Sequence, residues 1–395
     1  MPTRPCWVEI RTQSIEENFR FLAGQAAPHA ELLAIVKADA YGHGLALCAY
    51  AAVRAGARWL GVTSVEEGVA ARAVCPDAGI LVIGGVFPGQ GAALAAHRLA
   101  AVAWEPWQLD EMESAAVAAG LPPQSLPVHL EIDTGMSRQG ADPAALPPLL
   151  ARFHAASPLK LDGVMTHLFA ADEADGVITA MQMDRMDRAL EQLSGAGLWA
   201  EWLNVGASAA LLAGQAAALA TLAARHGMKA MMRPGLVLYG LAPEFLTSIE
   251  GEQPALLSAA RGRLKPVLSW KTRVTGVRSV PAGTVVGYNG TFVATEPMRL
   301  ALLPAGYADG LDRKLGNRFG LLVRGQRAPL VGRVSMDQSV IDVTEIPGVA
   351  PGDEVVIIGV QGDEAITAFD HARVCDTIVW EVFTRIGPRV PRIAV

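Results

Sequence analysis

A lysine stands at the end of the first strongly apolar run, in the stretch ELLAIVKADAYGHG at residues 31–44. The run LLAIV has the residue types of a strand that is buried on both sides. A buried strand has no structural need for a long cation at its end, so the cation is expected to take part in chemistry. Lys37 is therefore the first candidate catalytic residue.

Further polar side chains stand at the ends of later apolar runs. They are Glu131, followed closely by Arg138, then His167, Asn204, Ser208 and Arg233. A single histidine or asparagine at such a position more often caps a helix or forms a buried hydrogen bond than takes part in a reaction. Their recurrence at one strand end after another favours a functional site over that interpretation.

The residue types favour pyridoxal 5'-phosphate (PLP) chemistry. A lysine whose pKa is lowered by burial can attack a carbonyl carbon and form a Schiff base, which is how proteins hold PLP. The cofactor also needs backbone N–H groups and hydroxyls around its phosphate. The stretch NVGASAA, with Ser208 at the start of an expected short helix, could provide these groups, and Gly235 would permit close backbone approach. No metal is expected.

The elements that position these residues alternate up to residue 243. Short apolar runs, from LLAIVK to AMMRPG, are followed by helix-period stretches such as MQMDRMDRALEQLSGAG. An open doubly wound sheet would alternate in the same way, but about eight units in this length favour a closed barrel. Residues 11–243 are predicted to form a PLP-binding (β/α)8 barrel of the TIM type, with its site at the C-terminal ends of the strands.

The pattern changes beyond residue 243. Stretches such as LSWKTRVTGVRSV and GDEVVIIGV are strand-like and are separated by turn signals. Residues 244–395 are predicted to form a mainly-β domain. The opening stretch CWVEIRT is a strand with no helix before it, so residues 1–10 are expected to pair with this second domain.

Composition excludes several classes of protein. The net charge of −6 argues against a nucleic-acid partner. The four cysteines are scattered without a CxxC pair, which indicates neither a zinc site nor a disulfide framework. The chain shows no leader-type apolar segment and no membrane-length apolar stretch, so a cytoplasmic enzyme without a membrane partner is expected.

Six stretches carry a resemblance to a known family: VKADAYGHG, EIDTGMSRQG, THLFAADE, MRPGLVLYG, LPAGYADG and GRVSMDQ. In this order and spacing they resemble the signature stretches of the alanine racemase family of fold-type III PLP enzymes, over nearly the whole chain. One short motif would be weak evidence, but six in register are strong. The resemblance implies a PLP-dependent isomerase that interconverts L- and D-alanine and supplies D-alanine for peptidoglycan.

The resemblance also implies a two-base mechanism. Lys37 would hold PLP and act as acid or base on one face of the substrate, and Tyr288 would act on the opposite face. Arg233 matches the arginine that faces the pyridine nitrogen, and His167 matches the histidine that links this arginine to the tyrosine. Reference pKa values of about 10 and 10.4 for tyrosine and lysine are too high for a base at neutral pH, so the site must favour neutral lysine and phenolate.

Other positions are expected to bind the cofactor or the substrate. The cofactor would also contact Tyr41, Asn204, Ser208, Gly235 and Leu236, and the substrate would contact Arg138, Met336, Tyr307 and Asp337. Glu131 stands where several relatives have a lysine whose carbamate orients the arginine seven positions later, and a glutamate would supply the charge on a shorter arm. Some members have a tyrosine near the phosphate where this chain has Gly387 and Pro388.

The resemblance and the distribution of tyrosines both imply a homodimer. The barrel strand ends offer no tyrosine opposite Lys37, whereas the β domain contains Tyr288 and Tyr307 beside glycines. A twofold pair would share its two sites between subunits. A broad-specificity or serine racemase of the same fold remains an alternative. A non-catalytic PLP-binding protein is less favoured because such proteins resemble the barrel alone, and Arg233 disfavours a decarboxylase.

Overall fold

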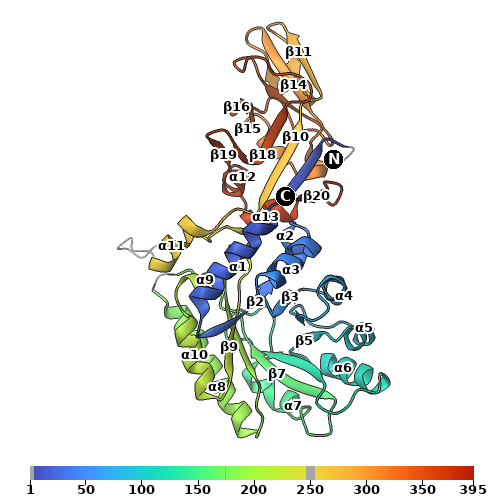
Figure 1. The fold of residues 1–395 in the computed structure, drawn as a ribbon, viewed down its shortest axis with the longest axis vertical. Helices are drawn as coiled ribbons and strands as arrows, with labels where there is room; N and C mark the ends of the chain where they lie inside the picture. The colour runs from blue at the N-terminus through green and yellow to red at the C-terminus, as the bar shows by residue number, and fades with distance from the viewer. Residues whose placement is uncertain (1–3, 174, 246–253) are drawn as a thin grey trace. The chain divides into compact units, whose positions relative to one another are not determined.

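The computed structural model describes residues 4–173, 175–245 and 254–395 of the chain. The described residues form two compact units (Figure 1). One unit, the barrel unit, contains residues 13–40 and the described part of 48–266. The other, the β unit, contains residues 4–12, 41–47 and 267–395.

The barrel unit extends further along the chain than the predicted boundary at residues 243 and 244. The side chain of Asn18 donates to Leu238 O at 3.0 Å and to Lys265 O at 2.9 Å, and it accepts a hydrogen bond from Lys265 N at 2.8 Å. A Cβ on Gly240 would lie 2.0 Å from Lys265 O, so the two backbones meet closely. These contacts fix the segment before Val267 to the barrel.

Residues 41–47 also depart from the predicted division, because they pack with the β unit. Arg392 Nε donates to Gly42 O at 2.9 Å. A Cβ on Gly42 would lie 2.4 Å from Phe383 O, and the glycine has a φ of +77°. Only a glycine meets both demands, so the sequence YGHG serves this contact.

The predicted (β/α)8 barrel is confirmed. Its strands are β2 (Ala30–Ile35), β3 (Trp59–Val62), β4 (Gly79–Val82), β5 (Ala100–Ala103), β6 (Leu126–Glu131), β7 (Leu159–Met165), β8 (Trp202–Ala207) and β9 (Lys229–Arg233). Each strand pairs in parallel with the next, and the pairing of Ala30 with Ala230 and of Leu32 with Met232 closes the ring. The parallel arrangement explains why the strands read as continuous apolar runs, since both faces are covered.

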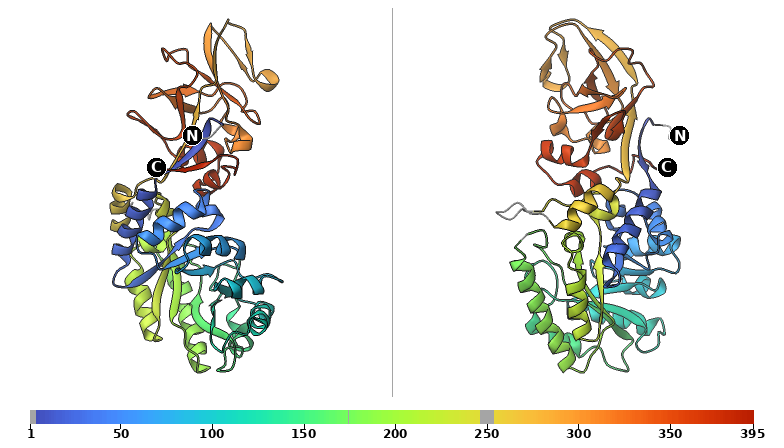
Figure 2. Two further views of the ribbon diagram at one scale, coloured as in Figure 1. Left: turned by 45° about the vertical axis from the view of Figure 1, so that its right-hand side comes forward. Right: turned by 60° about the vertical axis from the view of Figure 1, so that its left-hand side comes forward.

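Helices surround the barrel strands, as both views in Figure 2 show. They are α1 (Thr12–Ala26), α3 (Leu45–Arg54), α4 (Val65–Val74), α5 (Gly91–Ala96), α6 (Pro106–Ala118), α7 (Leu146–Leu150), α8 (Val177–Gly195), α9 (Ser208–Leu212), α10 (Ala216–Arg225) and α11 (Ala255–Arg263). Local sequence signals set their ends. At the start of α4, for example, the Ser64 hydroxyl accepts a hydrogen bond from Glu67 N at 3.3 Å, as an N-cap does.

The barrel interior is filled by side chains, and glycines make room for the largest of them. A Cβ on Gly61 of β3 would lie 2.4 Å from Leu33 Cδ2. A Cβ on Gly163 of β7 would lie 2.5 Å from the buried ring of His129. The interior is therefore a packed core, and the open end of the barrel is left for chemistry.

The predicted mainly-β character of the second unit is confirmed. Its largest sheet contains β16 (Gln326–Pro329), β15 (Gly320–Val323), β18 (Glu354–Gln361), β10 (Leu268–Arg273), β1 (Cys6–Ile10) and β20 (Arg392–Ala394), with β19 (Glu364–Ile366) paired to β18. The N-terminal strand β1 is antiparallel to β10 and parallel to β20.

The unit also contains two smaller sheets and the α-helices α12 and α13. The sheets contain β11 (Gly276–Val280), β14 (Met298–Leu303) and β17 (Ser339–Asp342), and β12 (Val285–Val286) with β13 (Phe292–Val293). The helices are α12 (Ala368–Cys375), which begins with a capping box of Thr367 and Asp370, and α13 (Val379–Thr384). Among the described residues, no helix combines the length and the apolar character needed to cross a membrane.

Candidate active site

The C-terminal ends of the barrel strands carry the predicted site residues of this unit. Lys37 follows β2, Glu131 ends β6, His167 follows β7, Asn204 lies in β8 and Arg233 ends β9. Because all the barrel strands are parallel, these positions lie at the same end of the barrel, where the βα loops form active sites.

Lys37 lies in an environment that favours its neutral amine. Burial is the main cause that lowers the pKa of Lys37, and the positive charges of Arg138 and Arg233 lower it further. The following residues of α2 (Lys37–Tyr41) are left-handed, with φ values of 53° at Ala38 and 52° at Asp39. Such a conformation costs a non-glycine residue about 1–2 kcal/mol, and proteins concentrate backbone strain of this kind at functional sites.

Arg233 is the most extensively anchored residue of the site. It is 4% exposed. Its Nη1 donates to Asn204 O at 2.6 Å and to Asn204 Oδ1 at 2.5 Å, and its Nη2 donates to Thr166 O at 2.8 Å. Burial lowers the pKa of Arg233 to about 10. At neutral pH the guanidinium is therefore still a cation, held by oxygen atoms of Asn204 in β8 and of Thr166, which directly follows β7.

His167 is neutral and has a defined tautomer. Burial, followed by the nearby charges of Arg233 and Arg138, lowers the pKa of His167 to about 3. Arg233 Nη2 lies 3.3 Å from His167 Nδ1. Since a guanidinium can only donate, Nδ1 must accept and the imidazole proton must be on Nε2. The Nε2–H group is thus available to donate to an oxygen atom of a ligand or of another residue.

The segments after β8 and β9 meet beside this cluster. Ser208, the first residue of α9, accepts a hydrogen bond from Gly235 N at 3.0 Å through its hydroxyl oxygen. Gly235 is followed by the short helix Leu236–Tyr239. Among the described residues, the buried Asn204 Nδ2 has no hydrogen-bond partner. A buried donor without a partner, on the residue that holds Arg233, fits a bound group that carries acceptor oxygens, as PLP does.

Glu131 does not pair with Arg138 in this structure. Its carboxylate accepts a hydrogen bond from Gln139 Nε2. Arg138 has no hydrogen-bond or ion-pair partner within residues 4–173, 175–245 and 254–395, and its side chain is exposed. Burial raises the pKa of Glu131 to about 7, although Gln139, Arg233 and Arg138 act in the opposite direction.

The remaining predicted residues belong to the β unit. Tyr307 N donates to Ser335 O at 3.0 Å and Ala308 N donates to Met336 O at 3.0 Å, so Tyr307 and Met336 lie on two loops that hold each other. Asp337, next along the chain, forms an ion pair with Arg389 at 2.8 Å. The structure thus gathers three of the predicted substrate-binding residues in one loop cluster.

Two tyrosines of the β unit differ in their surroundings. Tyr288 opens a short helical turn, Tyr288–Gly290, and is 67% exposed. Burial raises the pKa of Tyr41 to about 12, so its hydroxyl is protonated and can donate. The exposed side chain of Tyr288, by contrast, is accessible to a second molecule.

Sequence reasoning missed two glutamines that support the site. Gln182 of α8 donates through Nε2 to His167 O at 2.9 Å and to the Thr134 hydroxyl at 2.9 Å. Gln139 donates to Ile83 O at 2.8 Å as well as to Glu131. The available signal for Gln182 was a polar residue in the middle of an apolar helix face. For Gln139 it was the position next to the predicted Arg138.

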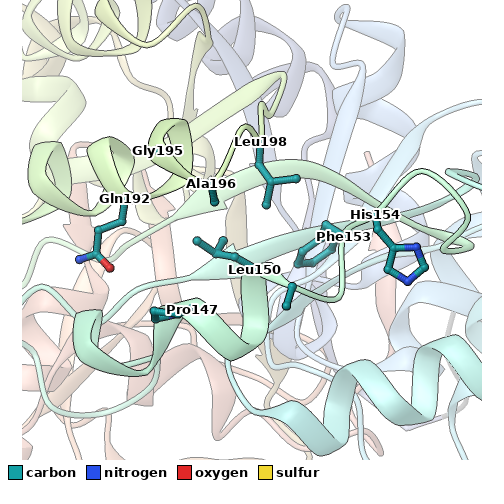
Figure 3. Close-up of a pocket in the computed structure, with 9 residues that line it drawn as sticks. Pro147, Leu150, Phe153, His154, Gln192, Gly195, Ala196 and Leu198 are labelled. Carbon is teal, nitrogen blue, oxygen red and sulfur yellow. The ribbon is translucent and has the colours of Figure 1, made fainter.

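A surface hollow of about 510 Å³ lies elsewhere on the barrel unit (Figure 3). It is lined by α7, by the C-terminal end of α8 and by residues such as Phe153, His154 and Leu198. Phe153 and His154 precede β7, and Leu198 precedes β8, so the hollow lies at the opposite ends of the strands from Lys37. It is therefore not part of the candidate active site.

Comparisons with known proteins agree with this geometry. The family profile "Alanine racemase, N-terminal domain" matches residues 10–243, and "Alanine racemase, C-terminal domain" matches residues 267–394. An alanine racemase of Halothermothrix orenii is 37% identical over 392 residues, which cover 99% of this chain and 97% of that protein.

Solved structures give the same result. The alanine racemase of D-cycloserine-producing Streptomyces lavendulae has a TM-score of 0.86 and 34% identity, covering 100% of this chain and 98% of that one. The alanine racemase of Bartonella henselae, described with covalently bound pyridoxal phosphate, has a TM-score of 0.82 and 26% identity and covers 100% of both chains. The chain belongs to the alanine racemase family of isomerases.

Proposed function

We propose that the chain interconverts L- and D-alanine with PLP as cofactor, through Lys37 and Tyr288 as the two bases. The observation that carries this proposal is the environment of Lys37, a partly buried amine at a strand end beside the cations Arg138 and Arg233. A neutral amine at that position can bind the cofactor's carbonyl carbon and can accept a proton at Nζ. When bound, PLP would supply the electron sink that acidifies the substrate's Cα–H bond.

Arg233 is suited to face the pyridine nitrogen of the cofactor and donate a hydrogen bond to it. A guanidinium donates but does not supply a proton near neutral pH, so the nitrogen would remain unprotonated and the electron sink weaker. Ser208, the backbone at Gly235 and Leu236, Asn204 and Tyr41 would hold the phosphate and the ring. Arg138, which is exposed and unpaired among the described residues, would bind the substrate carboxylate together with the loops of Tyr307 and Met336.

Tyr288 would carry the second proton from the opposite face. In the single chain it is 67% exposed, and Tyr307 and Met336 are 43% and 53% exposed. A site that is completed by a second copy of the chain would leave these three residues exposed in the single chain. The Nε2–H group of His167 would donate a hydrogen bond to the tyrosine oxygen. We therefore propose a homodimer with shared sites.

We place this activity in the cytoplasm and assign its D-alanine to peptidoglycan, as the sequence predicts. A broader or serine-directed racemase is the alternative. Chiral product analysis with a panel of L-amino acids separates these possibilities. Equal or higher turnover with L-serine would contradict alanine as the principal substrate.

The two-base mechanism is tested by subunit mixing. Tyr288→Phe should keep the cofactor's absorbance but lose activity by about 10²- to 10⁴-fold, the usual contribution of a positioned acid or base. Lys37→Ala should be inactive as well. Mixed dimers should regain activity, because one site would receive both substitutions and the other neither. Inactive mixed dimers, verified by differential tagging, would show that Tyr288 does not act across the interface.

A further inference from the structure

The loop after β6 carries Arg138 and is closed tightly at its base. Ala141 N donates to Glu131 O at 2.8 Å and Asp133 N donates to Ala141 O at 3.0 Å. The Asp133 carboxylate also accepts from Gly135 N at 2.8 Å and from Ser137 N at 3.0 Å. These bonds fix the base and the first half of the loop, but none of them holds the Arg138 side chain.

Gln139 makes the contacts that fix the second half of this loop to the barrel. Its Nε2 donates to Ile83 O at 2.8 Å, directly after β4, and to the buried carboxylate of Glu131 at the end of β6. A primary amide has two N–H groups on one nitrogen, one for each acceptor. A hydrocarbon side chain or a carboxylate of the same length would leave both acceptors unpaired.

We propose that Gln139 is a positioning residue for substrate binding, which holds the Arg138 guanidinium in place by joining the loop to Ile83 and to Glu131. The inference rests on the proposed function, in which Arg138 binds the substrate carboxylate. Glu131 then acts on Arg138 through Gln139, rather than by the direct ion pair that a longer anionic side chain could form. The resemblance to the family concerns Glu131 and Arg138 and implies no role for Gln139.

The ionisation of Glu131 provides a readout that is specific to this contact. Charged groups from several elements surround the carboxylate: Arg138 and Asp133 from the same loop, Arg233 from β9 and Lys37 after β2. The Gln139 hydrogen bond lowers the pKa of Glu131 against the effect of burial. Loss of that bond should therefore raise this pKa and move any activity limb that depends on Glu131 to higher pH.

The experiment compares Gln139→Met with Gln124→Met. Gln124, which lies just before β6, is a matched control. Its Nε2 donates to two backbone oxygens, His154 O and Leu159 O, both at 2.9 Å. In the PLP-loaded enzyme, Gln139→Met should raise KM for alanine by about 10- to 100-fold, as misplacement of an orienting group does. The value of kcat should change less, and the acid limb of kcat/KM should shift to higher pH. Gln124→Met should keep the wild-type kinetics and pH profile.

A second measurement does not depend on turnover. Urea unfolding of the apoenzyme across pH measures how its free energy of unfolding depends on the ionisation of Glu131. The upper end of this pH dependence should move to higher pH in Gln139→Met and not in Gln124→Met. If Gln139→Met does not fold, Gln139→Leu, which is also uncharged and has no side-chain N–H group, takes its place. An unchanged KM with an unmoved pH profile, or equal effects of the Gln139 and Gln124 substitutions, would overturn the inference. Wild-type enzyme that does not racemise any amino acid would instead overturn the proposed function.

Discussion

Replacement of Arg233 by lysine should destabilise the protein although the positive charge is kept. The reason is geometric. In the native site Nη1 serves Asn204 O and Oδ1, while Nη2 serves Thr166 O and lies beside His167 Nδ1. The single Nζ of a lysine can occupy one of these two nitrogen positions but not both.

The magnitude follows from the acceptors that lose their partner. Thr166 N donates to Asn204 O at 3.4 Å, so that carbonyl keeps one hydrogen bond. Either Asn204 Oδ1 or Thr166 O then remains buried without a donor. One such unpaired buried acceptor costs about 1–3 kcal/mol. The free energy of unfolding of Arg233→Lys should fall by this amount, and racemisation should fall with it.

Urea unfolding at one protein concentration measures this difference, because a dimer's stability depends on concentration. Arg225→Lys is the matched control. Arg225 is an arginine on the barrel unit whose side chain is 59% exposed and pairs with Asp187. An exposed pair of this kind should change stability by less than about 0.5 kcal/mol. Equal stabilities of Arg233→Lys and wild type, or an equally large effect of Arg225→Lys, would refute the reasoning.

Three further predictions concern the charges of the site. Lys37→Ala should abolish racemisation and the borohydride-trapped cofactor adduct, and mass spectrometry that finds the adduct in this variant would contradict the role of Lys37. Arg138→Gln should raise the pKa of Lys37, because it removes a cation that lowers it, so covalent loading of the apoenzyme at pH 8 should be slower than in wild type. The pKa of Glu131 is raised to about 7, so the folded state holds a proton that the unfolded state has lost. Stability should therefore fall as pH rises from about 4.3 to 7, and this part of the slope should be absent from Glu131→Gln in pH-dependent unfolding.

Much of the fold could be predicted because its signals are local. Each barrel strand is an apolar run whose length and flanking turns are visible in a few consecutive residues, and Lys37 is conspicuous as a cation directly after such a run. The N-cap of α4 at Ser64 is equally local. The compact barrel unit ends at Pro266 rather than at the predicted residue 243, because Lys265 is held to it by hydrogen bonds with Asn18, more than 200 positions earlier.

The sequence by itself determined the barrel, the mainly-β unit and the residue types at the strand ends, since periodicity and motif spacing are properties of neighbouring positions. Only the tertiary structure decided which of these residues touch. The partner of Glu131 is Gln139 rather than Arg138, and the same amide reaches Ile83, 56 positions earlier. The tautomer of His167 likewise depends on Arg233, 66 positions later. Such pairings form because closure of the barrel brings distant strand ends together, and no local pattern in the chain specifies their hydrogen-bond geometry.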